Sequence, residues 1–388
     1  MKNNRPAIVV VAYNRPKSLS RLLESIAKAS YPSHKINLII SIDFSENNQD
    51  VVRLAENFEW QHGKKKVLVQ SVNLGLKKHI LQCGDFTQTY GEIVILEDDL
   101  YVSPNFYDYT SQALRFSGDK DYVGGIALYN HKINVHTGEY FTALEDGFDN
   151  WYFQFACSWG QAWSANQWQG FKKWLTDHPN LPKSDKIPKN VSNWSDKSWL
   201  KFYIAYLVDT NRYFLYPKVS LSTNFNDSGT HVSQDSTTYQ VELFSAHEKE
   251  YKFSELKDSK ARYDAFFESE SVQESLGYDM DTVEVDLYGY KPMNGKQLWL
   301  TSKQLNYKIV QRFTRSLKPI ECNILANIPG NELFLYDIEQ PQGNTFENKR
   351  HLRFRRIIYS AKVLSYRKAT VVFRSLIWDR VKQMFSKN

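Results

Sequence analysis

Three consecutive acids, Glu97, Asp98 and Asp99, follow the apolar run of residues 93–96. A short apolar run of this kind is typical of a buried strand in a parallel sheet. Removing a bare carboxylate from water is costly, so the acids must lie where the strand emerges. A divalent cation could hold them together there, because carboxylate oxygens suit Mg²⁺ and Mn²⁺. The local pattern leaves one alternative open, an acidic surface turn without a ligand.

Polar side chains also follow two other expected strands. Asn14 and Arg15 follow the strand 7–13, and Asp43 follows the strand 36–42. In open α/β sheets, ligands bind outside the carboxyl ends of the strands. An acid in this position can hydrogen-bond a ribose hydroxyl or the edge of a base.

Positive charge near these strand ends could come from Arg15, Lys77 and Lys78. Together with the acids it describes a site for a nucleoside diphosphate and a divalent cation. Neither G-x-G-x-x-G after the first strand nor G-x-x-x-x-G-K-[ST] occurs, which argues against dinucleotide-binding and P-loop sites.

Strands and helices alternate at about 30 residues per unit, which predicts a doubly wound α/β layer. Ser18 is a candidate N-cap for the first helix. The expected helices are 19–29, 50–59, 77–89 and 201–208, and the further expected strands are 66–71, 92–99, 122–127 and 213–222. Two strand-like pieces follow near 283–288 and 320–326, and residues 180–198 are expected to form a loop.

Aromatic residues crowd the segment 148–174, and most of these rings are expected to be core. Gly160 lies in the middle of the segment, where the lack of a side chain would let the backbone approach a ligand closely.

The formal charge of +6 is unevenly distributed. Residues 349–388 hold twelve Lys and Arg against one acid, Asp379, so the rest of the chain is net negative. Basic residues alternate with apolar ones at helical spacing, which favours a helix lying on an anionic membrane surface. A solvated basic helix packed on the body or on a second subunit is the alternative.

We expect three regions: 1–240, catalytic; 241–347, an extension for acceptor or oligomer contacts; and 348–388, a basic amphipathic helical tail.

Three cysteines, Cys83, Cys157 and Cys322, have no metal-ligand spacing and are expected to be free thiols in a reducing compartment. No signal peptide and no apolar run long enough for a membrane span are visible. These features lead us to expect a cytoplasmic protein, peripheral at the inner face of the cell membrane. Nothing indicates nucleic-acid binding.

Several stretches resemble the GT-A glycosyltransferases. They are residues 12–16 (Ala-Tyr-Asn-Arg-Pro), Asp43, residues 73–75 (Asn-Leu-Gly) and residues 95–104. More narrowly, the run 97–106 (Glu-Asp-Asp-Leu-Tyr-Val-Ser-Pro-Asn-Phe) is similar to N-acetylglucosaminyltransferase I of family 13 and its bacterial relatives in family 2. The resemblance covers roughly residues 5–235. It implies a GT-A core, a Rossmann-like α/β fold that binds nucleotide-diphosphate sugars.

The resemblance also implies roles for individual residues. Asp99 would hold Mn²⁺ or Mg²⁺ against the diphosphate, Asp98 and Glu97 would face the ribose and the donor sugar, and Asp43 the nucleoside. The donor-binding set further includes Ala12, Tyr13, Asn14, Arg15 and Lys77, with Trp159 and Gly160 facing the donor sugar.

Family-13 enzymes invert the anomeric carbon and need a base for the acceptor hydroxyl. The family's Trp/Asp-rich loop corresponds to residues 194–199 (Trp-Ser-Asp-Lys-Ser-Trp), which nominates Asp196. The match is looser than the family's Trp-Asp-Asp-Trp, and Asp196 could instead be an N-cap for a helix over 197–208. His231 aligns with a Ser-His stretch and would meet the metal or a phosphate, although a lone histidine is more often structural.

The function expected from these features is that of a metal-dependent, inverting glycosyltransferase, a hexosyl- or N-acetylhexosaminyltransferase. It would move one sugar from a nucleotide donor, with UDP-N-acetylglucosamine or another UDP-hexose suggested by the family, to a glycan or lipid-linked oligosaccharide in surface polysaccharide biosynthesis. Two alternatives are a non-catalytic sugar-binding or scaffold protein and a sugar-1-phosphate nucleotidyltransferase. The sequence leaves the donor, acceptor, linkage and oligomeric state undetermined.

Overall fold

The computed structural model describes residues 5–32, 35–225, 227, 239–279 and 281–346. It also describes eight positions of the tail: 369–370, 373–374, 377–378 and 380–381. Predictions that fall on other residues, including His231, lie outside the described part of the chain.

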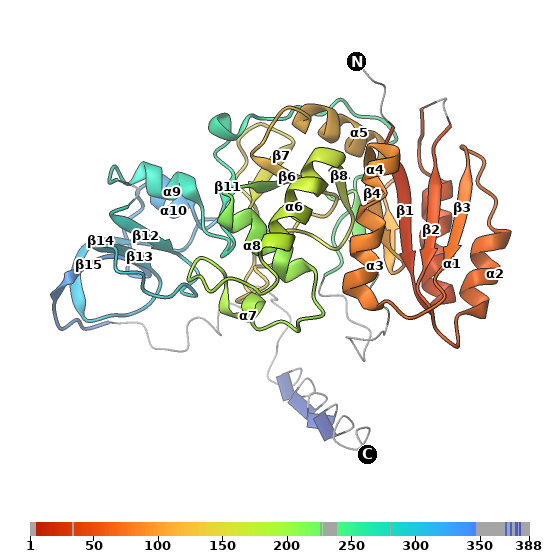
Figure 1. Ribbon diagram of the computed structural model, residues 1–388. Helices are drawn as coiled ribbons and strands as arrows, with labels where there is room; N and C mark the ends of the chain where they lie inside the picture. The colour runs from red at the N-terminus through yellow and green to blue at the C-terminus, as the bar shows by residue number, and fades with distance from the viewer. Residues whose placement is uncertain are drawn as a thin grey trace.

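A nine-stranded sheet forms the centre of the protein, in the order β11-β7-β9-β6-β8-β4-β1-β2-β3 (Figure 1). Its strands are β1 (Ala7–Ala12), β2 (Leu38–Ile42), β3 (Lys65–Val69), β4 (Glu92–Glu97), β6 (Val123–Ala127), β7 (Asn150–Phe153), β8 (Gln161–Ser164), β9 (Tyr213–Pro217) and β11 (Arg262–Tyr263). Strands β1 to β4 are mutually parallel, and β9 is parallel to β6. Because β8 is antiparallel to both β4 and β6, the ends of β1, β2, β4 and β6 meet at one carboxyl edge.

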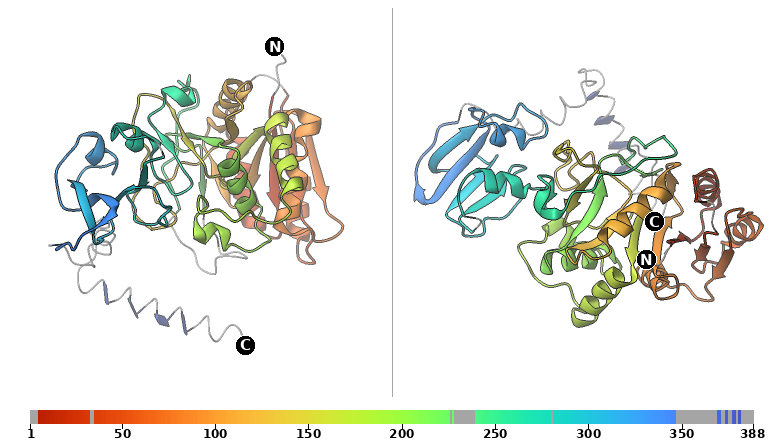
Figure 2. Two further views of the ribbon diagram at one scale, coloured as in Figure 1. Left: turned by 60° about the vertical axis from the view of Figure 1, so that its left-hand side comes forward. Right: turned by 90° about the horizontal axis from the view of Figure 1, so that it is seen from above.

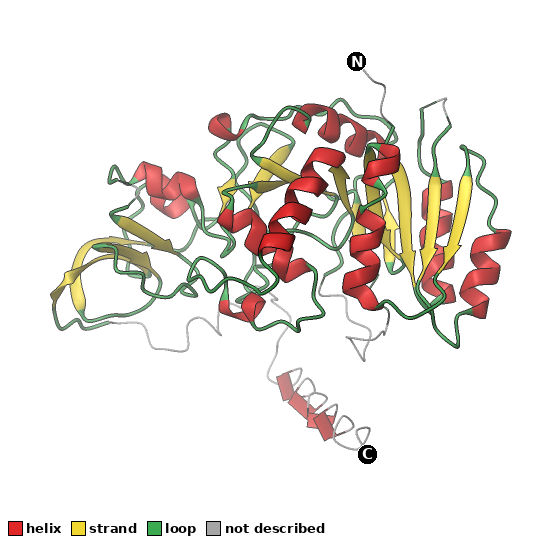
Figure 3. Ribbon diagram, in the orientation of Figure 1, coloured by secondary structure: helices red, strands yellow, loops and turns green. Residues whose placement is uncertain are grey.

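Helices cover both faces of this sheet, giving three layers (Figure 3). One face packs against α1 (Pro16–Ala27), α2 (Gln49–Asn57) and α5 (Phe106–Ser117), and the other against α3 (Gly75–Gly84), α4 (Thr87–Tyr90), α6 (Ala165–Asp177) and α8 (Leu200–Asp209). Alternation along the strands explains the two cores: Val9 and Ile95 enter one, and Val10 and Leu96 the other. The doubly wound prediction is confirmed for this part of the chain.

A second, four-stranded sheet lies at one end of the molecule, as two further views show (Figure 2). It has the order β12-β13-β15-β14, with β12 (Val283–Asp286), β13 (Leu298–Thr301), β14 (Tyr307–Phe313) and β15 (Leu333–Pro341). The helices α9 (Glu270–Ser275) and α10 (Cys322–Leu325) pack near it. Two short strands, β5 (Leu100–Val102) and β10 (Ser222–Asn224), pair separately, and α7 (Lys189–Ser192) and a 3₁₀ turn (Leu256–Asp258) complete the elements.

Several local predictions are wrong. Ser18 lies inside α1, which starts at Pro16, because proline suits the first helical turn, where its missing N–H is not needed. The expected helix 77–89 starts at Gly75 and is divided into α3 and α4. The strand expected at 320–326 is the short helix α10, and the expected strand 213–222 ends at Pro217.

The crowded rings of 148–174 are mainly core, as predicted: Trp151, Trp163 and Trp168 are fully buried. The three cysteines are free thiols. No helix among the described residues is both long and apolar enough to span a membrane. The region boundaries predicted between residues 240 and 241 and between residues 347 and 348 stay predictions. Strand β11, which belongs to the predicted region 241–347, pairs with β7 of the large sheet.

Candidate active site

The three acids lie at the end of β4, at the carboxyl edge of the large sheet. The N–H of Asp98 donates to the Val11 carbonyl at 3.0 Å, so the main chain of β4 stays paired with β1 up to this point. The N–H of Phe225 then donates to the Asp99 carbonyl at 2.9 Å, where β10 meets β5. Backbone pairing on both sides therefore fixes the acids next to the end of β1.

Arg15 holds two of these acids. Its guanidinium donates to Asp98, and a second nitrogen, Nη1, donates to Asp99 Oδ2 at 3.2 Å. The N–H of Tyr13 also donates to the Asp98 carboxylate. Tyr13 and Arg15, from the first motif, therefore contact the acids at the end of β4.

Burial dominates the ionisation of this cluster. It raises the pKa of Glu97 to about 8, and the neighbouring charges of Asp99 and Asp98 add to this effect. Burial also raises the pKa of Asp98 to about 6, although Arg15 partly opposes it. For Arg15, burial alone would lower the pKa, but the two aspartates outweigh it and raise the value. Without a further cation, Glu97 is therefore mainly protonated at neutral pH.

Three oxygens in the cluster are buried without a hydrogen-bond partner among the residues that the structure describes: Glu97 Oε1, Asp98 Oδ2 and Asp99 Oδ1. A buried carboxylate oxygen left unpaired is unfavourable, so these atoms fit a cation that supplies the missing ligand interactions. The side chains are not, however, gathered around one point. Among the residues that the structure describes, no three His, Cys, Asp or Glu side chains form a group able to hold a metal ion. The predicted ligand His231 lies outside those residues.

Asp43 sits at the end of β2 and binds the amino end of α3. Its Oδ1 accepts from the N–H of Phe44 at 2.9 Å and of Leu74 at 2.8 Å, and its Oδ2 accepts from the N–H of Gly75 at 2.9 Å. A carboxylate at this end of a helix is favourable, because the free N–H groups carry partial positive charge. Asp43 therefore has a structural part in addition to the nucleoside contact predicted for it.

Side chains from two stretches of the resemblance, residues 12–16 and 73–75, lie around Asp43. Asn73 donates to the Phe44 carbonyl at 2.8 Å and to the Tyr13 hydroxyl at 3.4 Å. Asn14 is exposed just beyond β1. Tyr13 and Asn14 of the predicted donor-binding set are thus neighbours of Asp43 around the ends of β1 and β2.

Asp196 lies in the loop before α8, with its side chain 99% exposed. Its Oδ1 accepts from Lys201 Nζ at 2.6 Å, and its carbonyl accepts from Lys77 Nζ at 3.4 Å. The alternative interpretation, an N-cap, is wrong because α8 begins at Leu200 and its N-cap residue is Trp199. Lys77 belongs to α3, so this contact brings Asp196 to the same edge of the sheet as Asp43.

Trp159 and Gly160 precede β8, also at the carboxyl edge. The Trp159 ring packs against Tyr129, with centroids 4.6 Å apart, and its carbonyl accepts from the Ser222 hydroxyl at 2.5 Å. Gly160 has φ +90°, and a Cβ there would lie 2.8 Å from Ser222 Oγ. The close approach observed at Gly160 is to Ser222 within the protein, and the predicted approach of this backbone to a ligand stays a prediction.

Sequence reasoning missed Lys201 and a second contact network beside Arg15. Asp227 Oδ2 accepts from the Ser18 hydroxyl at 2.6 Å and from Arg21, whose guanidinium also lies 3.7 Å from the Phe225 ring centroid. This network ties the chain beyond β10 to the first turns of α1. No local sequence pattern predicts this network, because residues 18 and 227 are far apart in sequence.

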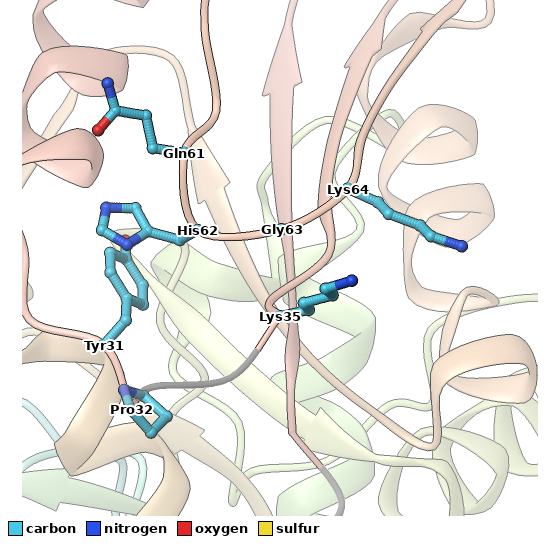
Figure 4. Close-up of a pocket in the computed structure, with 7 residues that line it drawn as sticks. All are labelled: Tyr31, Pro32, Lys35, Gln61, His62, Gly63 and Lys64. Atoms are coloured by element: carbon cyan, nitrogen blue, oxygen red, sulfur yellow. The ribbon is translucent and has the colours of Figure 1, made fainter.

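A hollow of about 440 Å³ lies at the opposite, amino edge of β2 and β3 (Figure 4). It is lined by Tyr31, Pro32, Lys35, Gln61, His62, Gly63 and Lys64. The rings of Tyr31 and His62 lie against each other, with centroids 4.5 Å apart. None of the predicted site residues lines this hollow.

Comparison with known proteins gives a family for the N-terminal part of the chain. Residues 7–160 match the model of Glycosyl transferase family 2. The solved structure of S. aureus TarS 1–349 is similar at 16% identity and a TM-score of 0.33, over 55% of this chain and 60% of that one. The mannosyltransferase PcManGT from Pyrobaculum calidifontis, in complex with GDP-Man and Mn²⁺, is similar at 14% identity and a TM-score of 0.33, over 55% and 57%.

These matches span less than two thirds of TarS 1–349 and of PcManGT. Other structures of TarS 1–349, similar at 15–16% identity, are in complex with UDP and with UDP-GlcNAc. The family match over residues 7–160 and the observed α/β sheet confirm the predicted resemblance to a GT-A core in this part of the chain.

Proposed function

We propose that this protein is a metal-dependent, inverting glycosyltransferase that moves one sugar from a nucleotide-diphosphate donor to a glycan or lipid-linked acceptor. The observation that carries the proposal is the acid cluster at the end of β4. Within the described part of the chain, three of its carboxylate oxygens are buried without a hydrogen-bond partner, and Arg15 is the one basic side chain paired with the cluster. A ligand that brings cationic charge would complete this cluster.

The donor would lie across the carboxyl edge of the sheet. Tyr13, Asn14 and Asp43 would face the nucleoside, and Glu97 and Asp98 the ribose and the sugar. Asp99 would be the acid that holds Mn²⁺ or Mg²⁺, an ion that acts as a Lewis acid for the departing diphosphate. Arg15 is bound to Asp98 and Asp99 in the free protein and would turn toward the phosphates when a cation takes its place.

Asp196 would be the base. In an inverting transfer, the acceptor hydroxyl attacks the anomeric carbon while a carboxylate takes its proton. Lys201 lowers the pKa of Asp196 through a hydrogen bond and its charge, so the carboxylate is ionised at neutral pH. Its exposure leaves room for an acceptor to approach.

One observation favours a second candidate, a sugar-binding or scaffold protein without turnover. The described acids are not arranged as a group of three metal ligands, and Arg15 neutralises two of them. A sugar-1-phosphate nucleotidyltransferase is less favoured, since the turn after β1 has no glycine. A measurement of sugar turnover distinguishes an active glycosyltransferase from a sugar-binding or scaffold protein.

The acceptor and the location of the protein belong to the same proposal. The tail positions that the structure describes are helical, and Phe373, Ile377 and Trp378 among them are exposed. Apolar and basic side chains at these positions would suit an anionic membrane surface, where a lipid-linked acceptor is found. We therefore propose that the enzyme acts at the cytoplasmic face of a membrane, in surface polysaccharide synthesis.

The test is nucleotide-sugar hydrolysis across a donor panel that includes UDP-GlcNAc, UDP-glucose and GDP-mannose, with Mn²⁺, with Mg²⁺ and with EDTA. Asp196→Asn is expected to bind the donor that wild type hydrolyses but to turn it over at least about 100-fold more slowly, as expected for loss of a positioned base. Donor binding without hydrolysis by wild type would favour the scaffold. Absence of binding under every condition would reject both.

A further inference from the structure

Two lysines from different helices converge on the loop that carries Asp196. Lys201, from the first turn of α8, donates to Asp196 Oδ1 at 2.6 Å and to the Trp194 carbonyl at 2.9 Å. Lys77, from α3, donates to the Asp196 carbonyl at 3.4 Å. The Phe202 ring lies beneath both cations, with its centroid 3.7 Å from Lys77 Nζ and 5.6 Å from Lys201 Nζ.

The ion pair is asymmetric in its exposure. The Lys201 side chain is 3% exposed, whereas the Asp196 side chain is 99% exposed. A pair between two exposed side chains contributes little, because both can leave for water. Here the ammonium is fixed inside the protein, so the exposed carboxylate must come to it. The pair therefore sets the position of Asp196, not that of Lys201.

We propose that Lys201 is a positioning residue for the transfer reaction: it anchors one oxygen of Asp196 and directs the other outward to receive the proton of the acceptor hydroxyl. This inference rests on the proposed function. Among the described residues, Asp196 Oδ1 has Lys201 as its partner, and no hydrogen bond to Oδ2 is found. Oδ2 is therefore available at the surface.

The step balances without any further reactant. The O–H bond of the acceptor breaks and its proton goes to Asp196 Oδ2. The acceptor oxygen forms the new bond to the anomeric carbon, while the bond from that carbon to the diphosphate breaks and its electron pair leaves with the nucleoside diphosphate. In hydrolysis, water takes the place of the acceptor hydroxyl.

The charged groups that face Asp196 come from both packed elements, Lys201 from α8 and Lys77 from α3. Lys201 lowers the pKa of Asp196 by a hydrogen bond and by its charge, and Lys77 adds a smaller effect of the same sign. Burial lowers the pKa of Lys77, and the neighbouring charge of Lys201 lowers it further. Removing Lys201 should therefore raise the pKa of Asp196 as well as release its side chain.

The test compares Lys201→Met with Lys197→Met, which removes an equal charge from an exposed position of the same loop. The probe is hydrolysis of whichever nucleotide sugar wild type hydrolyses. For Lys201→Met we expect kcat to fall about 10- to 100-fold, because a base displaced by about 1 Å loses this much. The KM for the donor should stay within about twofold, as expected when an interaction made in the transition state is lost. The acid limb of the pH profile of kcat should move to higher pH. Lys197→Met should leave kcat, KM and the acid limb unchanged.

Lys201→Arg keeps a cation at the same place and guards against a loss of folding in Lys201→Met. Lys201→Arg should return the acid limb of the pH profile toward that of wild type, and its kcat should lie between those of wild type and Lys201→Met. A purely structural lysine would instead lower thermal stability and donor affinity together, without moving the acid limb, and that result would overturn the inference. If Asp196→Asn is as active as wild type, the assignment of the base fails first and the role of Lys201 fails with it. If Asp196→Asn is inactive but Lys201→Met behaves like Lys197→Met, only the role of Lys201 is rejected.

Discussion

At the end of β4, Asp98 and Asp99 share the guanidinium of Arg15, while the partly buried Glu97 beside them forms no ion pair with any described residue. Each acid must either be neutralised or carry a proton, because a buried bare carboxylate is unfavourable. Protonation is the solution available to Glu97, whose pKa is raised to about 8 by burial and by the two aspartates. Without a bound cation, the carboxyl groups of this site therefore carry protons that a bound cation would displace.

Binding of Mn²⁺ should release protons from this cluster. The cation favours ionised carboxylates, and at pH 6.5 Glu97 is mainly protonated and Asp98 partly so. We expect about one proton per bound ion at this pH, since metal ligands must be deprotonated, and less at pH 9. Calorimetry in two buffers with different ionisation enthalpies measures the number. Glu97→Gln should release fewer protons, and a binding enthalpy independent of buffer would contradict this account.

The sequence predicted which acids meet at this site but not how they are held. The run Glu97-Asp98-Asp99 after an apolar strand required an exit at the sheet edge, and the structure has it there. The pairing of Arg15 with two of the acids depends on the turn after β1, which the sequence pattern does not specify. Lys201 follows Asp196 by five positions, outside the three- and four-residue spacings that indicate a helical ion pair.

At the scale of elements, α3 is oriented by a side chain from another element. Asp43 of the β2 end accepts the N–H groups of Leu74 and Gly75, so the amino end of α3 points at the carboxyl edge. This orientation brings Lys77 to the loop of Asp196. One carboxylate therefore connects the nucleoside region with the region of the proposed base.

Asp43→Ala should destabilise the protein as well as weaken donor binding. Loss of an acceptor at a helix amino end costs about 0.5–2 kcal/mol, and burial of Asp43 favours the upper part of this range. Urea unfolding measures the free energy. The control is Asp50→Ala, an exposed acid in the first turn of α2 whose partner is the exposed Arg53, and it should change stability by less than about 0.5 kcal/mol. Equal losses in both variants would contradict the role of Asp43.

Gly160→Ala tests the close approach before β8. The φ of +90° disfavours a side chain, and the new Cβ would lie 2.8 Å from Ser222 Oγ, so we expect a loss of about 2 kcal/mol or more. Gly138→Ala is the matched control, with φ +71° and open space around a new Cβ, and it should cost about 1 kcal/mol. Thermal unfolding of both variants compares them. A smaller loss at Gly160 than at Gly138 would reject the steric argument.

Helices and strands with a clear pattern of apolar residues were predictable from the sequence. Strand pairings between segments that are far apart in the sequence were not. The strands around Val9, Ile40 and Ile95 follow from continuous apolar runs, and all three residues are buried. The segment 320–326 was predicted as a strand from its apolar residues, but a run this short fits either structure. The small sheet joins β12 to β13 and β15 across loops, a pairing with no signal in the local pattern.

At the scale of the whole molecule, the predicted site and the basic tail are separate parts of the chain. The predicted donor and base residues lie at the carboxyl edge of one sheet. The charge that makes the protein basic is concentrated beyond residue 348. Loss of the tail should therefore change location without changing the chemistry.

Removal of residues 348–388 should abolish binding to anionic vesicles and leave donor hydrolysis unchanged. Each Lys or Arg near an anionic surface contributes about 1 kcal/mol, so twelve such residues are more than sufficient. Co-sedimentation with phosphatidylserine-containing vesicles, with pure phosphatidylcholine vesicles as control, measures binding. Retention of the truncated protein on anionic vesicles would show that another surface binds the membrane.

The most direct test of the central claim is the affinity for the hydrolysed nucleotide sugar, measured with Mn²⁺ and with EDTA in wild type and in Asp99→Ala. The account predicts that wild type binds the donor tightly only with the metal, and that Asp99→Ala binds it weakly in both conditions. It also predicts that Asp119→Ala, which removes an exposed acid paired with Lys120, behaves as wild type. Equal affinity of wild type in Mn²⁺ and EDTA would contradict the claim that the acids of β4 bind the donor through a cation.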